Sequence, residues 1–137
     1  MHNCIESMHP RAREGIRLFN QGRFFEAHEE LEAAWREESG KIRELYQGIL
    51  EAGVTLFHLG RGNLTGALKV YDRSMGWLKD WPEVCGGAHI GRLRRDLQSA
   101  VEEASRLGAD RLAEINPSLL KPILVFEETK GWDNAGN

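Results

Sequence analysis

Apolar residues recur three and four positions apart in five segments of the chain, and this period constrains the fold more than any other feature. The segments are residues 10 to about 20, about 23–38, about 41–59, 63–81 and about 89–107. Pro10 and Asn63 suit the starts of helices, and Gly108 suits the end of one. Strand signals are almost absent, and the remainder holds one short predicted helix between prolines. The sequence therefore predicts an all-α fold.

Two stretches of the chain resemble each other, FNQGRFFEAHEEL at residues 19–31 and LGRGNLTGALKVY at residues 59–71. Each is predicted to be a helix end, a tight glycine turn and a new helix, with Ala27 or Ala67 where two helices approach closely. This arrangement resembles the helix hairpins of tetratricopeptide (TPR) repeats, whose period is a little shorter. A long solenoid would need more repeats. We therefore expect a compact bundle of about five helices, built from two TPR-like hairpins and a C-terminal helix.

Composition and charge limit the classes of function. With 41% hydrophobic residues, 28% charged residues and a net charge of −3, the chain is typical of a soluble globular protein and lacks the basic character of a nucleic-acid binder. No apolar run has the ~20 residues that span a bilayer, and no signal peptide is evident. The two cysteines make no disulfide framework, so we expect a cytoplasmic protein with free thiols.

The chain length predicts one domain over residues 1–137. We expect its core to lie within about residues 9–125. The tail, about residues 126–137, is expected to be flexible.

A histidine interrupts the apolar face of the second segment. On a helical wheel, His28 falls among Phe24, Leu31 and Trp35, and Glu32 follows one turn later. A buried imidazole needs a polar partner. The pattern therefore predicts a buried pair of His28 and Glu32.

The third segment is almost entirely apolar over residues 45–59, which predicts a central helix. Apart from the Tyr46 hydroxyl, its polar side chains share one face of the wheel and include no Lys or Arg. These side chains are Gln47, Glu51, Thr55 and His58. An ordinary solvent-exposed face in this chain would be rich in Lys and Arg, so this stripe is a candidate site.

We expect the two polar stripes to face each other between the second and third helices. The predicted pocket gathers His28, Glu32, Gln47, Glu51 and His58, with Trp35 and Tyr46 as walls. Bundle interiors are where sites of this kind are built. A competing interpretation gives no pocket. In that interpretation the polar stripe of the third segment is the narrow exposed edge of a buried helix, and His28 and Glu32 simply form a hydrogen bond in the core.

Two ligand classes suit the predicted pocket. Imidazoles and carboxylates bind divalent metals such as Zn, Fe or Mn, and the predicted metal ligands are His28, Glu32, Glu51 and His58. Without a metal, the pocket would hold a small polar molecule, and the predicted ligand-binding residues are Trp35, Tyr46 and Gln47. If chemistry occurs, His28 is the candidate general base and Glu32 orients its tautomer. The sequence leaves the question of enzyme activity open.

The alternative hypothesis gives the His–Glu residues a purely structural role. The repeat-like hairpins, the absence of a nucleophile motif and four tryptophans suit a TPR-like module for peptide interaction or oligomerisation, and a homodimer is kept open. We expect neither nucleic acid nor a membrane as a partner.

Three motifs together resemble a known family: FN-x-G-x-FFEAHE-x-LE-x-x-W from residue 19, YQGIL from residue 46, and HL-x-x-GN-x-x-GA from residue 58. They are similar to the bacterial and archaeal family called domain of unknown function 309, over roughly residues 12–80. The family's hallmark is an HxxxExxW motif, which here is His28, Glu32 and Trp35. The resemblance implies a small all-α bundle and no established activity. The family commonly has Gln at the position of Glu51, which weakens any inference of a metal chemistry shared by the whole family.

Overall fold

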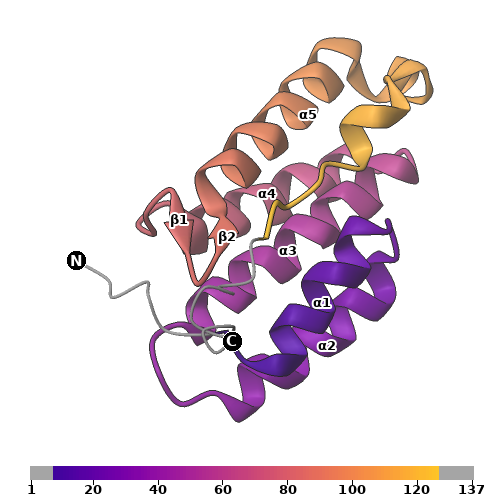
Figure 1. The fold of residues 1–137 in the computed structure, drawn as a ribbon. Helices are drawn as coiled ribbons and strands as arrows, with labels where there is room; N and C mark the ends of the chain where they lie inside the picture. The colour runs from indigo at the N-terminus through magenta and orange to yellow at the C-terminus, as the bar shows by residue number, and fades with distance from the viewer. Residues whose placement is uncertain (1–7, 127–137) are drawn as a thin grey trace.

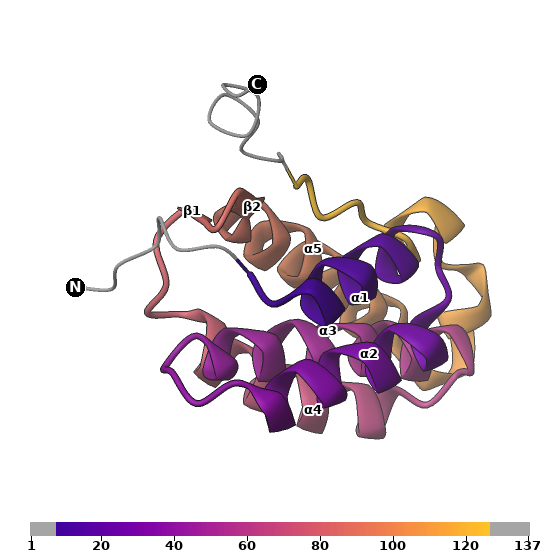
Figure 2. The ribbon, with the colours of Figure 1, turned by 60° about the horizontal axis from the view of Figure 1, so that its bottom comes forward.

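Helix α3 is the centre of the fold in the computed structural model, which describes residues 8–126 (Figure 1). Helices α2 and α4 flank α3, α1 packs on α2, and α5 packs on α4 (Figure 2). The five α-helices of the described residues are α1 (Pro10–Asn20), α2 (Phe24–Glu37), α3 (Arg43–Gly60), α4 (Leu64–Leu78) and α5 (Ile90–Arg111). The prediction of an all-α bundle of about five helices is confirmed.

The helix ends follow the sequence signals. Pro10 is the first residue of α1, and the Asn63 side chain caps α4 by accepting a hydrogen bond of 2.9 Å from the Gly66 backbone N–H. Helix α5 continues to Arg111 across a break at Gly108, whose φ of 76° is not helical. The short helix predicted between prolines is the 3-10 helix η2 (Pro117–Leu120), and a second 3-10 helix, η1 (Leu112–Glu114), precedes it.

The segment between α4 and α5 contains a short β-hairpin. Strand β1 (Val84–Cys85) pairs in antiparallel fashion with β2 (Ala88–His89), and Ala88 also forms a bridge with Phe126. Cys85 is buried in this hairpin. The last described residues of the chain thereby return to the start of α5.

The two helix hairpins turn in the same way. Gly22 and Gly62 have φ angles of 76° and 78°, which glycine adopts at no steric cost. In the first turn the backbone N–H groups of Gly22 and Arg23 donate to the carbonyls of Phe19 and Leu18, and in the second those of Gly62 and Asn63 donate to Leu59 and His58. Both turns are Schellman motifs, so the sequence repeat corresponds to a repeated turn.

The core surrounds α3 and reaches every helix of the bundle. Two glycines allow close helix contacts: a Cβ on Gly15 of α1 would lie 2.6 Å from Leu31 Cγ, and one on Gly48 of α3 would lie 2.5 Å from Leu78 Cδ2. Ala27 and Ala67 are buried at the positions that the repeat predicts. Small residues therefore set the spacing between α1 and α2 and between α3 and α4.

Within residues 8–126, no helix combines the length and the apolar character that crossing a membrane requires. Most of the predicted flexible tail, residues 127–137, lies outside the described residues, as does Cys4.

Candidate functional site

His28 lies at the edge of α2 rather than in the core. The buried residues of α2 are Ala27, Leu31 and Ala34, whereas His28 is only partly buried. Helix α1 packs closely against α2 at Gly15, on the side of α2 that carries Ala27 and Leu31. The centre of the buried face is therefore rotated away from His28, and the prediction of a buried His28 is wrong.

Glu32 is paired with a neighbour on its own helix. Its Oε2 lies 3.3 Å from Nη2 of Arg36, one turn further along α2, and its side chain is partly exposed. In the part of the chain that the structure describes, His28 and Glu32 form neither a hydrogen bond nor an ion pair with each other. The predicted His28–Glu32 pair is therefore corrected to a Glu32–Arg36 pair.

Gln47 and Glu51 form a separate polar network with α4. Nε2 of Gln47 donates to Oε2 of Glu51 at 2.5 Å, and Nε of Arg73 donates to Oε1 of Glu51 at 3.2 Å. Glu51 is buried, with 8% of its surface exposed, so Arg73 supplies the cation that a buried carboxylate needs. The sequence reasoning missed Arg73. Its signal was the lack of any Lys or Arg on the polar stripe of α3, which left Glu51 in need of a cation from another helix.

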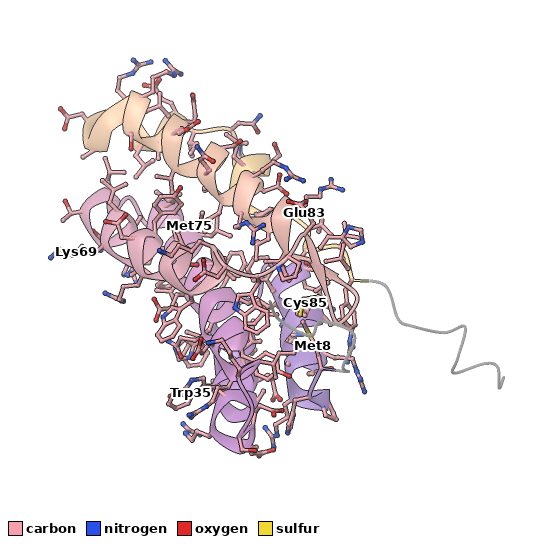
Figure 3. All side chains as sticks on the ribbon, turned by 90° about the vertical axis from the view of Figure 1, so that its left-hand side faces the viewer. Met8, Trp35, Lys69, Met75, Glu83 and Cys85 are labelled. Carbon is pink, nitrogen blue, oxygen red and sulfur yellow. The ribbon has the colours of Figure 1, made fainter. Side chains whose placement is uncertain are left out.

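Trp35 and Tyr46, the predicted walls, lie apart from this network. The guanidinium carbon of Arg43 lies 4.1 Å from the centroid of the Trp35 ring, and Arg43 Nε donates to the Trp35 carbonyl. Trp35 is at the edge of the molecule (Figure 3). Tyr46 is fully buried, and its hydroxyl accepts a hydrogen bond of 2.7 Å from the His9 backbone N–H. Tyr46 therefore fixes the start of α1 and is a core residue.

The two predicted histidines do come together, at a cavity of about 240 Å³ between the start of α2 and the end of α3. We call its lining the aromatic patch: Phe24, Phe25, His28, Val54, Phe57 and His58. Phe25 is 70% exposed and Phe57 is 43% exposed. The sequence reasoning missed both, although the paired Phe24-Phe25 was a signal, because adjacent residues of a helix point in different directions and one of the two often faces solvent.

Polar groups at the rim of the aromatic patch have few partners. Nδ1 of His58 lies 3.2 Å from Nδ2 of Asn63, and the Arg61 guanidinium carbon lies 5.3 Å from the centroid of the Phe57 ring. The His28 side chain has no hydrogen bond to any other described residue. The patch is thus an apolar surface whose polar groups are mainly two imidazoles.

The predicted metal site is not assembled. Among residues 8–126, no three His, Cys, Asp or Glu side chains converge on a point that could hold a metal ion. Of the four predicted ligands, His28 and His58 share the aromatic patch, while Glu32 and Glu51 are paired with arginines elsewhere. Zinc sites usually take three or four protein ligands, and two imidazoles fall short of that number.

One shifted ionisation lies near the aromatic patch. A hydrogen bond from its own backbone N–H, followed by one from the Arg23 guanidinium, lowers the pKa of Glu26 below its ordinary value. Glu26 is in the first turn of α2, where a carboxylate also interacts favourably with the helix dipole. This carboxylate therefore stabilises the start of the helix that carries His28.

The chain is similar to one family model over part of its length and to one relative over most of it. A model of the family described as Domain of unknown function (DUF309) matches residues 12–70, which include the whole aromatic patch but not Arg73. The chain is also 27% identical over 111 residues to an uncharacterized protein of Aquifex aeolicus (strain VF5), a match that covers 80% of this chain and 31% of that relative. The chain thus spans less than a third of the relative's length. The match of the family model to residues 12–70 agrees with the resemblance that the motifs predicted.

Proposed function

We propose that this protein is a helical interaction module and that the aromatic patch between α2 and α3 is its contact surface. The observation that carries the proposal is the exposure of Phe25 and Phe57 at the two sides of a cavity of about 240 Å³. Exposed apolar surface beside a concavity is typical of sites that receive an apolar group of a partner.

The energetics favour an apolar partner group over a small polar ligand. Burying apolar surface contributes about 25 cal/mol per Å², and aromatic rings bury more surface than most side chains. His28 and His58 add hydrogen-bonding nitrogens at the rim, which can orient a partner without supplying most of the affinity. The polar groups that the sequence assigned to a ligand site, Glu32 and Glu51, are already paired with arginines.

The repeated hairpins support the same class of function. Two helix pairs joined by the same Schellman turn agree with the TPR-like interpretation, and stacked helix pairs of that class form binding surfaces. A role of His28 as a general base stays a hypothesis, because no described residue forms a hydrogen bond with its ring. The interaction module is the hypothesis that uses the exposed rings, and we prefer it for that reason.

The test uses an apolar fluorescent probe, 1-anilinonaphthalene-8-sulfonate, which binds exposed hydrophobic surface. We expect the dilute protein to bind the probe at the aromatic patch. Truncating both rings in a Phe25→Ala/Phe57→Ala double variant should weaken binding at least about tenfold, because each lost aromatic contact costs on the order of 1–2 kcal/mol.

Val84→Ala is the matched control, since Val84 is also an exposed apolar residue but lies in β1, outside the aromatic patch. It should bind the probe as the unchanged protein does. Equal binding by the double variant, or an equal loss in Val84→Ala, would overturn the assignment of the contact surface. Far-UV circular dichroism checks that each variant is folded.

A further inference from the structure

We propose that the partner of the aromatic patch is a second copy of this chain, held in a two-fold symmetric contact in which Glu29 of each copy pairs with Arg61 of the other. This inference rests on the proposed function, because it names an occupant for the same surface. A two-fold contact uses one surface twice, so that surface must be complementary to itself. The aromatic patch meets this requirement in its apolar residues and in the charges beside it.

The apolar part of the surface can cover itself. Phe25 comes from α2 and Phe57 from α3, and both are exposed on the same face as the cavity. When two copies face each other, the rings of one copy pack over the cavity of the other. This contact buries both aromatic patches and removes them from water. Aromatic side chains in this position are typical of the residues that dominate the energetics of protein contacts.

Glu29 is the carboxylate of α2 that lacks an internal partner. Four of the five glutamates in this helix form ion pairs within the chain, namely Glu26 with Arg23, Glu30 and Glu37 with Arg11, and Glu32 with Arg36. Glu29 is exposed and forms no ion pair in the described structure. It stands one turn after Phe25, so its charge lies directly beside the aromatic patch.

Arg61 is a matching cation on the other helix. It follows the last residue of α3, and its guanidinium lies over the exposed ring of Phe57 at 5.3 Å from the centroid. The described residues offer it no carboxylate partner. Arg61 therefore brings a positive charge to the edge of the aromatic patch, where an arginine can both cover a ring and bind a carboxylate.

The two charges lie on opposite sides of the aromatic patch. Helices α2 and α3 run antiparallel, since the start of α2 meets the end of α3 at the cavity while Arg43 at the start of α3 covers Trp35 near the end of α2. Glu29 therefore lies beyond the patch in one direction along the hairpin, and Arg61 lies beyond it in the other. A two-fold axis in the plane of the contact can place each Glu29 against Arg61 of the second copy, which forms two equivalent ion pairs.

The experiment is a charge-reversal cycle on the full chain, read by sedimentation equilibrium from about 1 µM to about 500 µM, a range that detects micromolar association. We expect a monomer–dimer equilibrium. Glu29→Arg and Arg61→Glu should each raise the dissociation constant of the dimer at least about tenfold, because each places like charges at both contacts. The double variant restores opposite charges and should return to within about threefold of the unchanged protein.

Lys69→Glu is the matched control for Arg61→Glu, because Lys69 is exposed on α4 and points away from the body of the molecule (Figure 3). It makes the same change in net charge and should leave the dissociation constant unchanged. A strict monomer over the whole range overturns the inference. So does a dimer that the single reversals do not weaken, or one that the double variant does not restore. If a reversal variant loses its helical circular dichroism, Phe25→Ser provides a second test and should also abolish the dimer.

The probe experiment separates the failure of this inference from the failure of the proposed function. If copies cover each other's aromatic patches, the fluorescence of the bound probe per chain should fall as the protein concentration rises. Probe binding by a chain that stays monomeric would overturn the dimer and leave the interaction module standing. A dilute chain that does not bind the probe would overturn the module itself.

Discussion

The carboxylate of Glu51 on α3 and the guanidinium of Arg73 on α4 form an ion pair with unequal exposure. Oε1 of Glu51 lies 3.2 Å from Nε of Arg73, and the two side chains are 10% and 60% exposed. The cost of removing a charge from water therefore falls mainly on Glu51, while Arg73 keeps much of its hydration. The pair also joins α4 to the central helix α3. The next residue of α4, Ser74, makes a second link, because its hydroxyl donates to the Gly48 carbonyl at 2.8 Å.

Removing Arg73 should destabilise the fold more than an ordinary surface substitution does. Arg73→Ala leaves the Glu51 carboxylate buried with only Gln47 as a side-chain partner. We expect a loss of about 1–2 kcal/mol in the free energy of unfolding, less than for a fully buried pair because Arg73 is exposed. Urea denaturation measures this change.

The control for this prediction is a double-mutant cycle with Glu51→Gln, which removes the charge and keeps the shape. Arg73→Ala should cost at least about 0.5 kcal/mol less in the Glu51→Gln background than in the unchanged protein. Equal costs in both backgrounds would mean that the ion pair contributes nothing to stability.

Replacing Arg23 by Asn, the N-cap residue that α4 already has, should stabilise the start of α2. Arg23 and Asn63 occupy equivalent N-cap positions with similar backbone angles (φ −90°, ψ 70° and φ −97°, ψ 79°), but Arg23 makes no side-chain capping bond. Arg23→Asn would also place a capping residue three positions before Glu26, which forms a capping box. We expect a gain of about 0.5–1 kcal/mol in the free energy of unfolding, after the loss of the exposed Arg23–Glu26 pair.

The reference for this gain is Asn63→Ala, which should cost about 1 kcal/mol because the Gly66 N–H loses its acceptor. Both values come from urea denaturation. If Arg23→Asn lowers stability, the two turns are not interchangeable and the structural repeat is limited to the backbone.

Local signals were sufficient to predict the helices. Pro10, Gly22, Gly62 and Asn63 act within a single turn of chain, so their effects appear in the sequence and in the structure at the same residues. The strands β1 and β2 were not predicted, because each has two residues and no alternating pattern can be detected over that length.

The candidate site could be predicted only in part, because its geometry depends on contacts between helices. A helical wheel placed His28 on the apolar face of α2, but α2 packs on both α1 and α3, and the close contact at Gly15 rotates the buried centre toward Ala27. The partner of Glu32 was visible in the sequence, since Arg36 stands four residues later and such pairs form readily on a helix. The partner of Glu51 comes from another helix and could not be read from spacing.

Tyr71 on α4 should ionise at higher pH than an ordinary tyrosine. Partial burial is the main cause of its raised pKa, and the nearby carboxylates of Glu102 and Asp72 add to it. Because the folded state holds this proton more tightly than the unfolded state, the associated stability is fully present below the unfolded pKa of about 10. It is lost as the pH rises through the folded pKa.

The measurement for Tyr71 is an ultraviolet absorbance titration at alkaline pH. Subtracting the titration curve of Tyr71→Phe removes the signal of the second tyrosine and leaves that of Tyr71. Glu102→Gln should lower the pKa of Tyr71 only partly, because burial is the larger cause. A complete return to the ordinary value in Glu102→Gln would show that the carboxylate, and not burial, controls the ionisation.

Gly48, at the α3–α4 contact, and Gly76, on the exposed side of α4, should respond to the same substitution with opposite signs. A Cβ on Gly48 would lie 2.5 Å from Cδ2 of Leu78 and 3.1 Å from Cβ of Trp77, so Gly48→Ala forces the two helices apart and should cost about 1–3 kcal/mol. A Cβ on Gly76, in the interior of α4, would meet nothing within 4 Å. There alanine has the higher helix propensity, and Gly76→Ala should raise the free energy of unfolding by about 0.5–1 kcal/mol. Urea denaturation of the two variants side by side measures both signs. A neutral Gly48→Ala would show that α4 can move away from α3 at little cost, and the Glu51–Arg73 pair would then lengthen as well.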